Sequence, residues 1–238
     1  MIQHLYLDCP CTSFPRSFAR DFKETYRYPP PSTVYGFLLS LVGEEDMTTH
    51  LGVRLAIGLI GEEPPISRIV RKQRHHKFDN GGPDHKRRVD KFGEGVYPTS
   101  QFSKPNHHEL LTQLKVAIRV DSSEETATVK LTDRVAIALA TPEQITRFGG
   151  LSLGESWAMV NGVRTYRETD GAIRWLIKDN RGLIGLPVWI NRKTGRGTFQ
   201  RFSWSNDWHE DCWVTIPKSV EPVPQANKSK RSTRKSKS

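Results

Sequence analysis

Cysteine, methionine and long apolar runs are scarce in this sequence. Its 238 residues include three cysteines and three methionines. An odd and sparse set of cysteines cannot form a disulfide framework, which excludes a disulfide-stabilised scaffold and favours a reducing compartment. No apolar run approaches the length of a membrane span. The N-terminus lacks a basic start followed by an apolar stretch, so we expect no secretory signal, a cytoplasmic location and no membrane partner.

Acidic residues are also in deficit. There are 36 Lys and Arg against 26 Asp and Glu, a net charge of +10. Residues 228–238 carry six basic and no acidic residues, and residues 68–91 carry nine Lys or Arg against three Asp. Clustered positive charge favours a polyanionic partner, in the cytosol chiefly nucleic acid. For the C-terminal cluster alone, solubility explains the charge equally well.

The length and composition suit a globular protein of one large domain or two small ones. Apolar and polar residues alternate over residues 2–7, which predicts a strand. Residues 9–31 show no such period and are predicted to form a loop that ends in three prolines. A helix then begins, with Ser32 or Thr33 as its cap, and an apolar stripe runs to Val42 before Gly43 ends it.

Two half-buried strands are predicted at residues 53–59 and 110–120. Their polar faces carry Arg54, Lys115 and Arg119. Between them lies an apolar-poor insert, residues 61–109. A structureless loop of that length is unusual in a compact domain, so we expect a functional protrusion.

The later part of the chain is mostly β-like. The periodicity of residues 131–139 fits a helix and a strand equally well, and Thr141 begins a short helical turn. Further strands are expected at residues 174–178, 186–190, 198–204 and 213–216. The element order predicts an α+β fold of the ferredoxin-like type, which RNA-recognition motifs share and which presents an open sheet face to a ligand.

The segment ETYRYPPPSTVYGFLL, residues 24–39, resembles the signature of the CRISPR-associated Cas5 family, RAMP-type subunits of type I Cascade complexes. The segment RFGGLSLGES, residues 147–156, resembles the glycine-containing segment after that family's second helix. The two stand in the expected order, and the basic insert falls where the family has its thumb hairpin. The resemblance implies a ferredoxin-like core at 1–156 with the thumb at 61–109, a β-rich region at 157–217 and a disordered basic tail at 218–238.

The same resemblance implies a role in gripping the repeat-derived 5′ handle of a CRISPR RNA (crRNA). The implied partners are that handle, an adjacent backbone subunit whose filament the protein caps, the large subunit that reads the protospacer-adjacent motif (PAM), and target DNA near the PAM. No cofactor is expected, because the sequence has no Walker loop or dinucleotide fingerprint.

Chemistry compatible with RNA binding is concentrated in three places. The start of the predicted helix offers N–H groups to a phosphate, Gly36 permits close approach, and tyrosines before it could stack on bases or pack in the core. The insert is expected to clamp the guide backbone, with a solvated loop as the alternative. The glycine pair at 149–150 could approach phosphates or end a helix. The candidate RNA-binding residues are Arg16, Arg20, Lys23, Tyr26, Arg27, Tyr28, Ser32, Thr33, Gly36, Arg71, Lys72, Arg74, Lys86, Arg87, Arg88, Lys91, Arg147, Gly149 and Gly150.

Two other hypotheses use different residues. One branch of the family cleaves its own precursor RNA without metal, and the candidate catalytic residues here would be Tyr26, Tyr28, Lys72, His75 and His76. A non-catalytic role is favoured, because nothing in the sequence orients the histidine pair. A metal site built from Cys9, Cys11, His209 and Cys212 is a weak candidate, since its spacing is unusual for zinc. A generic basic RNA-binding protein would leave the proline-rich segment unexplained.

Overall fold

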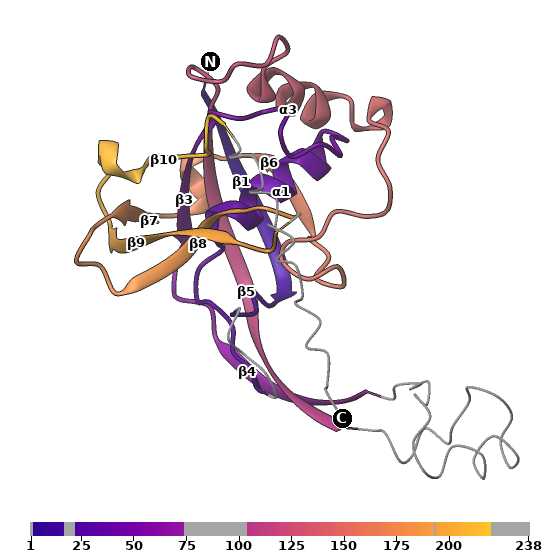
Figure 1. The fold of residues 1–238 in the computed structure, drawn as a ribbon, viewed down its shortest axis with the longest axis vertical. Coiled ribbons are helices and arrows are strands. Elements are labelled where there is room, and N and C mark those ends of the chain that lie inside the picture. Colours follow the sequence, from indigo (N-terminus) through magenta and orange to yellow (C-terminus); the bar gives the residue numbers. More distant parts are fainter. Residues whose placement is uncertain (1, 17–21, 74–103, 193, 220–238) are drawn as a thin grey trace, which may run out of the picture.

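The computed structural model describes residues 2–16, 22–73, 104–192 and 194–219. Within them, two helices accompany one largely antiparallel sheet of ten strands (Figure 1). The strands are β1 (Ile2–Thr12), β2 (Phe22–Lys23), β3 (Arg54–Ile60), β4 (Ile66–Gln73), β5 (Lys104–Asp121), β6 (Gly162–Thr165), β7 (Ile173–Lys178), β8 (Ile184–Ile190), β9 (Gly197–Ser205) and β10 (Val214–Thr215), and the helices are α1 (Pro31–Leu41) and α3 (Leu131–Ala140).

The sheet follows the order β6-β1-β5-β3-β7-β9-β8, while β10 pairs with β3, and β2 and β4 pair with β5. The first strand is longer than predicted, so the predicted loop begins only after Thr12. The four predicted C-terminal strands are confirmed with shifted bounds, but the short β6 was not predicted. Because β7 pairs with β3, the C-terminal strands continue the same sheet.

Helix α1 confirms the predicted apolar stripe, since Val34, Phe37 and Leu38 are buried and Gly43 follows with φ 69°. The predicted caps are wrong. Pro30 is the N-cap, no side chain caps the helix, and Ser32 and Thr33 lie inside its first turn. Proline has no N–H group and its φ is preset for a helix, so this N-terminus begins without a side-chain cap.

Residues 131–140 form a helix, which the periodicity left open. Its N-terminus is held by groups from the preceding loop. The Glu125 carboxylate accepts the Leu131 N–H at 3.0 Å, and Ser122 Oγ accepts the Thr132 N–H at 3.2 Å. The two capping groups lie six and ten residues before the N–H groups that they accept, which is farther than a local cap motif extends.

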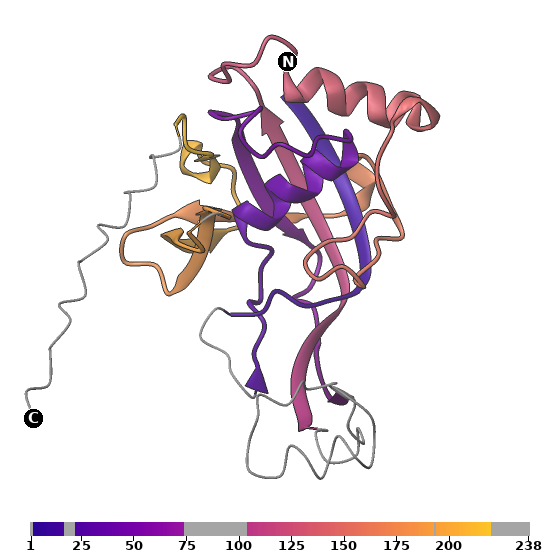
Figure 2. The ribbon, with the colours of Figure 1, turned by 45° about the vertical axis from the view of Figure 1, so that its right-hand side comes forward.

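The main core lies between the helices and one face of the sheet (Figure 2). Leu5 and Leu7 from β1, Leu55 and Ile57 from β3, and the buried face of α1 meet there. Alternation along the strands sends these side chains to one face.

The prediction of a half-buried strand is wrong for β3, whose second face is also covered. Every residue of β3 after Arg54 is buried, and Ala56 and Ala117 pack against Trp175 and Trp213. The Arg119 guanidinium lies 4.0 Å from the centre of the Trp208 ring. Aromatic side chains from the C-terminal region therefore cover the face that was expected to be open, although Lys115 remains exposed.

The insert begins and ends as paired strands. β4 pairs antiparallel with the first part of β5, from Ile66 opposite Leu111 to Gln73 opposite Lys104. Figure 1 shows the resulting two-stranded ribbon running away from the rest of the sheet. Residues 74–103, which connect these two strands in the sequence, lie outside the described residues. In the described part of the chain, no helix has the length and apolarity needed to cross a bilayer.

Candidate nucleic-acid interface

The segment 22–28 runs along the root of the ribbon and carries four predicted binding residues, Lys23, Tyr26, Arg27 and Tyr28. Phe22 and Lys23 pair in parallel with His107 and His108 of β5. Thr25 bridges to Pro15, and its N–H donates to Glu109 Oε2 at 3.3 Å. These contacts hold the segment against β5, so its side chains share a surface with those of the ribbon.

Aromatic and basic side chains lie together on both faces of the ribbon root, which we call the ribbon-root surface. Phe22, Arg68 and His107 form its first half on one face of the ribbon, and Lys23, Arg71 and Trp157 form its second half on the other. The Arg68 guanidinium lies 5.7 Å from the Phe22 ring centre, and the Phe22 and His107 rings meet edge to face at 6.3 Å. Arg68 Nε also contacts Glu109 Oε1 at 3.3 Å, yet its side chain is 75% exposed. Exposed guanidinium groups beside aromatic faces suit the phosphates and bases of single-stranded RNA.

The second half of this surface is centred on Trp157. Its indole N–H donates to Glu155 Oε2 at 2.8 Å, and the Arg71 guanidinium lies 5.9 Å from its ring. Lys23 Nζ is 3.6 Å from the other oxygen of Glu155. Glu155 thus orients one aromatic and one cationic side chain at the ribbon root.

His108 lies beneath this group and is 1% exposed, with Nε2 3.2 Å from Glu155 Oε2. Burial lowers the pKa of His108, while the Glu155 carboxylate opposes that change. The net direction favours the neutral imidazole. Since Nε2 has no partner with hydrogen-bond geometry, we regard the contact with Glu155 as packing of a neutral ring.

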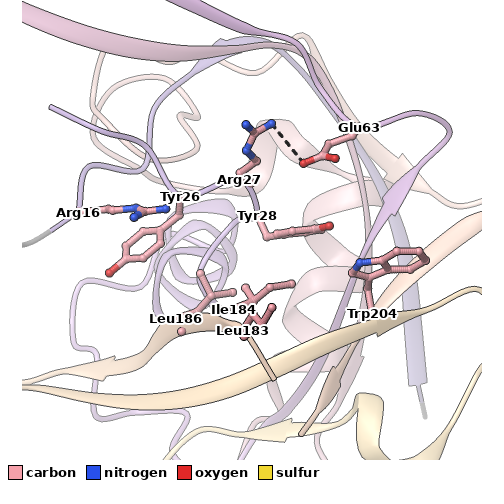
Figure 3. Close-up of a pocket in the computed structure, with 10 residues that line it drawn as sticks. Arg16, Tyr26, Arg27, Tyr28, Glu63, Leu183, Ile184, Leu186 and Trp204 are labelled. Carbon is pink, nitrogen blue, oxygen red and sulfur yellow. Dashed lines mark hydrogen bonds and ion pairs between the residues drawn. The ribbon is translucent and has the colours of Figure 1, made fainter. Parts of the chain in front are cut away.

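Four predicted residues from the loop before α1 line a pocket of about 360 Å³ (Figure 3). Arg16, Tyr26, Arg27 and Tyr28 line one side of it. Tyr28 is 6% exposed and belongs to the core, whereas Tyr26 is only partly buried. Burial raises the pKa of Tyr28, so its hydroxyl is protonated near neutral pH.

The basic residues around this pocket already have partners. Arg16 lies 3.4 Å from Glu24 and 5.5 Å from the Tyr26 ring centre. Arg27 lies 3.4 Å from Glu63. Exposed pairs of this kind are weak and can be exchanged for phosphate contacts, but they leave less free charge than the sequence implied.

The first turn of α1 and the glycine pair lie elsewhere. Ser32 Oγ is buried without a hydrogen-bond partner, and a Cβ on Gly36 would meet no atom within 4 Å. Gly36 and Arg147 line a separate pocket of about 540 Å³. Gly149 has φ 77°, so its conformation suits glycine. Thr33 is partly buried in the helix, and Gly150 approaches Met159.

Several predicted residues cannot be placed. The backbone of Lys72 lies in β4, but its side chain is outside the description. The remaining predicted residues of the insert and the loop before β2 are outside the described residues altogether: Arg20, Arg74, His75, His76, Lys86, Arg87, Arg88 and Lys91.

The four candidate metal ligands do not come together. Cys9 is buried in the core beneath the helices, and Cys212 is buried in the cluster on the opposite face. Burial raises the pKa of Cys9 to about 11. Among the described residues there is no group of three or more His, Cys, Asp or Glu that could hold a metal ion, so the set with Cys11 and His209 is not assembled.

The sequence reasoning missed Phe22, Arg68, His107 and Trp157. Arg68 and His107 were within the basic insert and its flank, so the charge pattern could have included them. Trp157 directly follows the second signature segment, but its place beside Arg71 depends on contacts between distant parts of the chain.

Comparisons with known proteins identify a relative in sequence and a similar solved structure. No protein-family model matches the chain. A curated relative, "CRISPR-associated protein Cas5" of Myxococcus xanthus (strain DK1622), is 32% identical over 200 residues, which cover 82% of this chain and 85% of the relative.

Two solved structures resemble the chain over most of its length. A chain of a "CRISPR RNA-guided surveillance complex" has a TM-score of 0.57 and 14% identity, with 95% of each chain covered. A "Crystal structure of Cas protein" has a TM-score of 0.47 and 11% identity over 92% of this chain and 96% of the other. The first of them shares the mixed architecture, with its large antiparallel sheet.

Proposed function

Because the chain belongs to the CRISPR-associated protein Cas5 family, we propose that it is a non-catalytic RNA-binding subunit of a type I CRISPR surveillance complex, Cascade. In this role it grips the repeat-derived 5′ handle of the crRNA in the cytoplasm. The observation that carries the proposal is the ribbon-root surface, where an exposed arginine lies beside an aromatic ring on each face of the ribbon. Single-stranded RNA is commonly bound by this combination of stacking and charge.

The topology supports a RAMP-type core. The chain order β1-α1-β3-β5-α3-β6, with sheet order β6-β1-β5-β3, has the strand and helix succession of a ferredoxin-like fold. In this interpretation the β4–β5 ribbon and residues 74–103 form the thumb. The thumb then extends from the surface that holds the RNA, and its basic residues follow the guide backbone.

The partners follow from the same proposal. The protein caps the filament of backbone subunits, abuts the large PAM-reading subunit and lies near the target DNA at the PAM. The solved chain with the same architecture comes from a "CRISPR RNA-guided surveillance complex", which supports an assembly of this kind.

The endoribonuclease alternative has less support in the described residues. Tyr28 is buried with a raised pKa, and Tyr26 packs against Arg16. A general base or acid must reach the reacting group and have a pKa near the working pH. Tyr28 fails on both conditions, because it is buried and its pKa is raised, and the histidine pair lies outside the described residues.

The test is to incubate the full-length protein with its cognate precursor repeat RNA in excess EDTA, and to run a denaturing gel and a binding titration on the same sample. A scrambled RNA of equal length is the control for selectivity. We expect selective binding and intact RNA. A discrete cut that disappears in His75 or His76 variants would establish the enzyme instead, and equal affinity for the scrambled RNA would refute handle recognition.

A variant with Arg71, Lys72 and Arg74 reversed to Glu tests the clamp. The fold should persist, because surface substitutions of this kind usually cost little stability. Assembly on the guide should weaken. Normal assembly by the folded variant would contradict a role for the ribbon in holding RNA.

A further inference from the structure

The pocket of about 360 Å³ beside the Tyr26–Tyr28 segment (Figure 3) is separate from the ribbon-root surface and was not anticipated as a unit. Its other side comes from β8 and β9, where Ile184, Leu186 and Trp204 line it. We propose that this pocket takes one unpaired base of the bound RNA, with Trp204 as its stacking platform. The inference rests on the proposed function and adds to it a defined base subsite.

Two aromatic side chains of the pocket are each held by a cation. The Arg174 guanidinium lies 5.1 Å from the Trp204 ring centre, and Arg16 lies 5.5 Å from that of Tyr26. Trp204 is nevertheless 50% exposed. A cation over one face of a ring restrains the ring and leaves its other face for a ligand. A restrained aromatic platform loses little entropy when a base stacks on it.

Unpaired polar groups beside the apolar floor favour a base over a purely apolar ligand. Nε and Nη2 of Arg174 are buried and have no hydrogen-bond partner. Its charge acts on Tyr28, where it opposes the rise in pKa that burial causes. The Tyr28 hydroxyl is protonated near neutral pH, because burial raises its pKa, and it can therefore donate a hydrogen bond. A base with a carbonyl acceptor can accept a hydrogen bond from this hydroxyl, and the positive charge of Arg174, which packs on Trp204 without lining the pocket, favours such an acceptor.

The path of the chain links the pocket to the ribbon root. Phe22 and Lys23 lie on the ribbon-root surface, and Tyr26, Arg27 and Tyr28 of the same segment line the pocket. An RNA strand that follows this segment passes from the phosphate-binding arginines to the pocket. The volume of the pocket suits one base with part of its sugar, and a duplex would not enter it.

The charges near the pocket also favour nucleic acid over a peptide. Arg16 pairs with Glu24 and Arg27 with Glu63, and among the charges that act on Tyr28 the two arginines Arg27 and Arg174 outnumber Glu63. The fully exposed Leu183 at the rim provides an apolar edge on which a base can rest. Mixed aromatic, apolar and cationic linings are typical of base-binding pockets.

The experiment uses repeat-containing RNAs with 2-aminopurine at one position at a time, bound to the full-length protein. Stacking on an indole quenches 2-aminopurine fluorescence. We expect quenching at one position that Trp204→Ala abolishes, with about tenfold weaker binding of the RNA. The matched control is Phe199→Ala, because Phe199 lies on the same strand, is also 50% exposed and does not line the pocket.

A second variant tests the subsite at a position where a substitution should not disturb the fold. Leu183→Asp places a negative charge at the rim, and since Leu183 is 98% exposed the substitution leaves the core intact. It should abolish the same quenching. Selective RNA binding with no position that depends on Trp204 and Leu183 would overturn the base subsite and leave the proposed function standing.

Two other outcomes have distinct meanings. If the wild-type protein shows no preference for repeat RNA, the proposed function fails together with the subsite. If Trp204→Ala binds RNA normally but loses another protein subunit of the complex, the pocket docks a protein and the base subsite is wrong.

Discussion

Neutralising Arg68 and Arg71 together should reduce the salt dependence of RNA binding by a calculable amount. Each phosphate contact to a single strand contributes about 0.7 to the slope of log affinity against log salt. The double variant Arg68→Gln, Arg71→Gln should therefore lower the magnitude of the slope by about 1.4. Over a fourfold rise in salt, the wild type should lose about sevenfold more affinity than the variant.

The structure indicates that this change acts on binding and leaves folding nearly unchanged. Both side chains are exposed, and Arg68 has one ion pair, 3.3 Å from Glu109. Glu109 is buried, but its carboxylate also accepts the Thr25 N–H and a Gln at position 68 can still donate to it, so loss of this pair should cost on the order of 1 kcal/mol. Urea unfolding of the free variant should therefore resemble that of the wild type.

The assay is a series of titrations with the repeat RNA at several salt concentrations. The matched control is Arg196→Gln, Arg201→Gln, which removes the same charge from exposed positions near and within β9. We expect the control to keep nearly the wild-type slope. Equal slopes for the two double variants would refute a specific role for the ribbon root and would leave only the net charge as the cause of binding.

Three further predictions concern stability. Burial lowers the pKa of His4 to about 4 from 6.5, and Arg119 adds to this change, so the unfolded chain binds more protons between these values. Stability should therefore fall as the pH drops through this window, and urea unfolding of His4→Gln should lack this loss. Gly154 has φ 96° and an added Cβ would lie 2.5 Å from a backbone oxygen, so Gly154→Ala should lower the melting temperature, while Gly185→Ala, with open space around it, should not. Arg134 donates to Glu44 at 2.7 Å in a partly buried site, so Arg134→Met should cost about 2 kcal/mol in chemical denaturation, and a cost near zero would contradict a structural role for this pair.

Local features of the chain could be predicted without the structure. Helix α1 follows from its apolar period, from the prolines before it and from Gly43 after it, because helix boundaries depend on neighbouring residues. The basic insert was visible as charge, and its flanks form the paired strands β4 and β5. The family also followed from residues alone, and the relative from Myxococcus xanthus confirms it.

Contacts between distant residues needed the tertiary structure. The free face of the sheet was assigned wrongly, because Trp175 and Trp213 come from far along the chain to cover Ala56. No strand pattern reveals what will pack on its second face.

The charged segments, helix α1 and the family could all be identified from short stretches of the chain. How these residues combine depends on the tertiary structure. It placed Trp157 beside Arg71 and Trp204 near Tyr28, and it paired Arg27 with Glu63. The physical reason is that charge and period are properties of short segments, whereas a binding surface consists of contacts that form when segments far apart in the chain pack together.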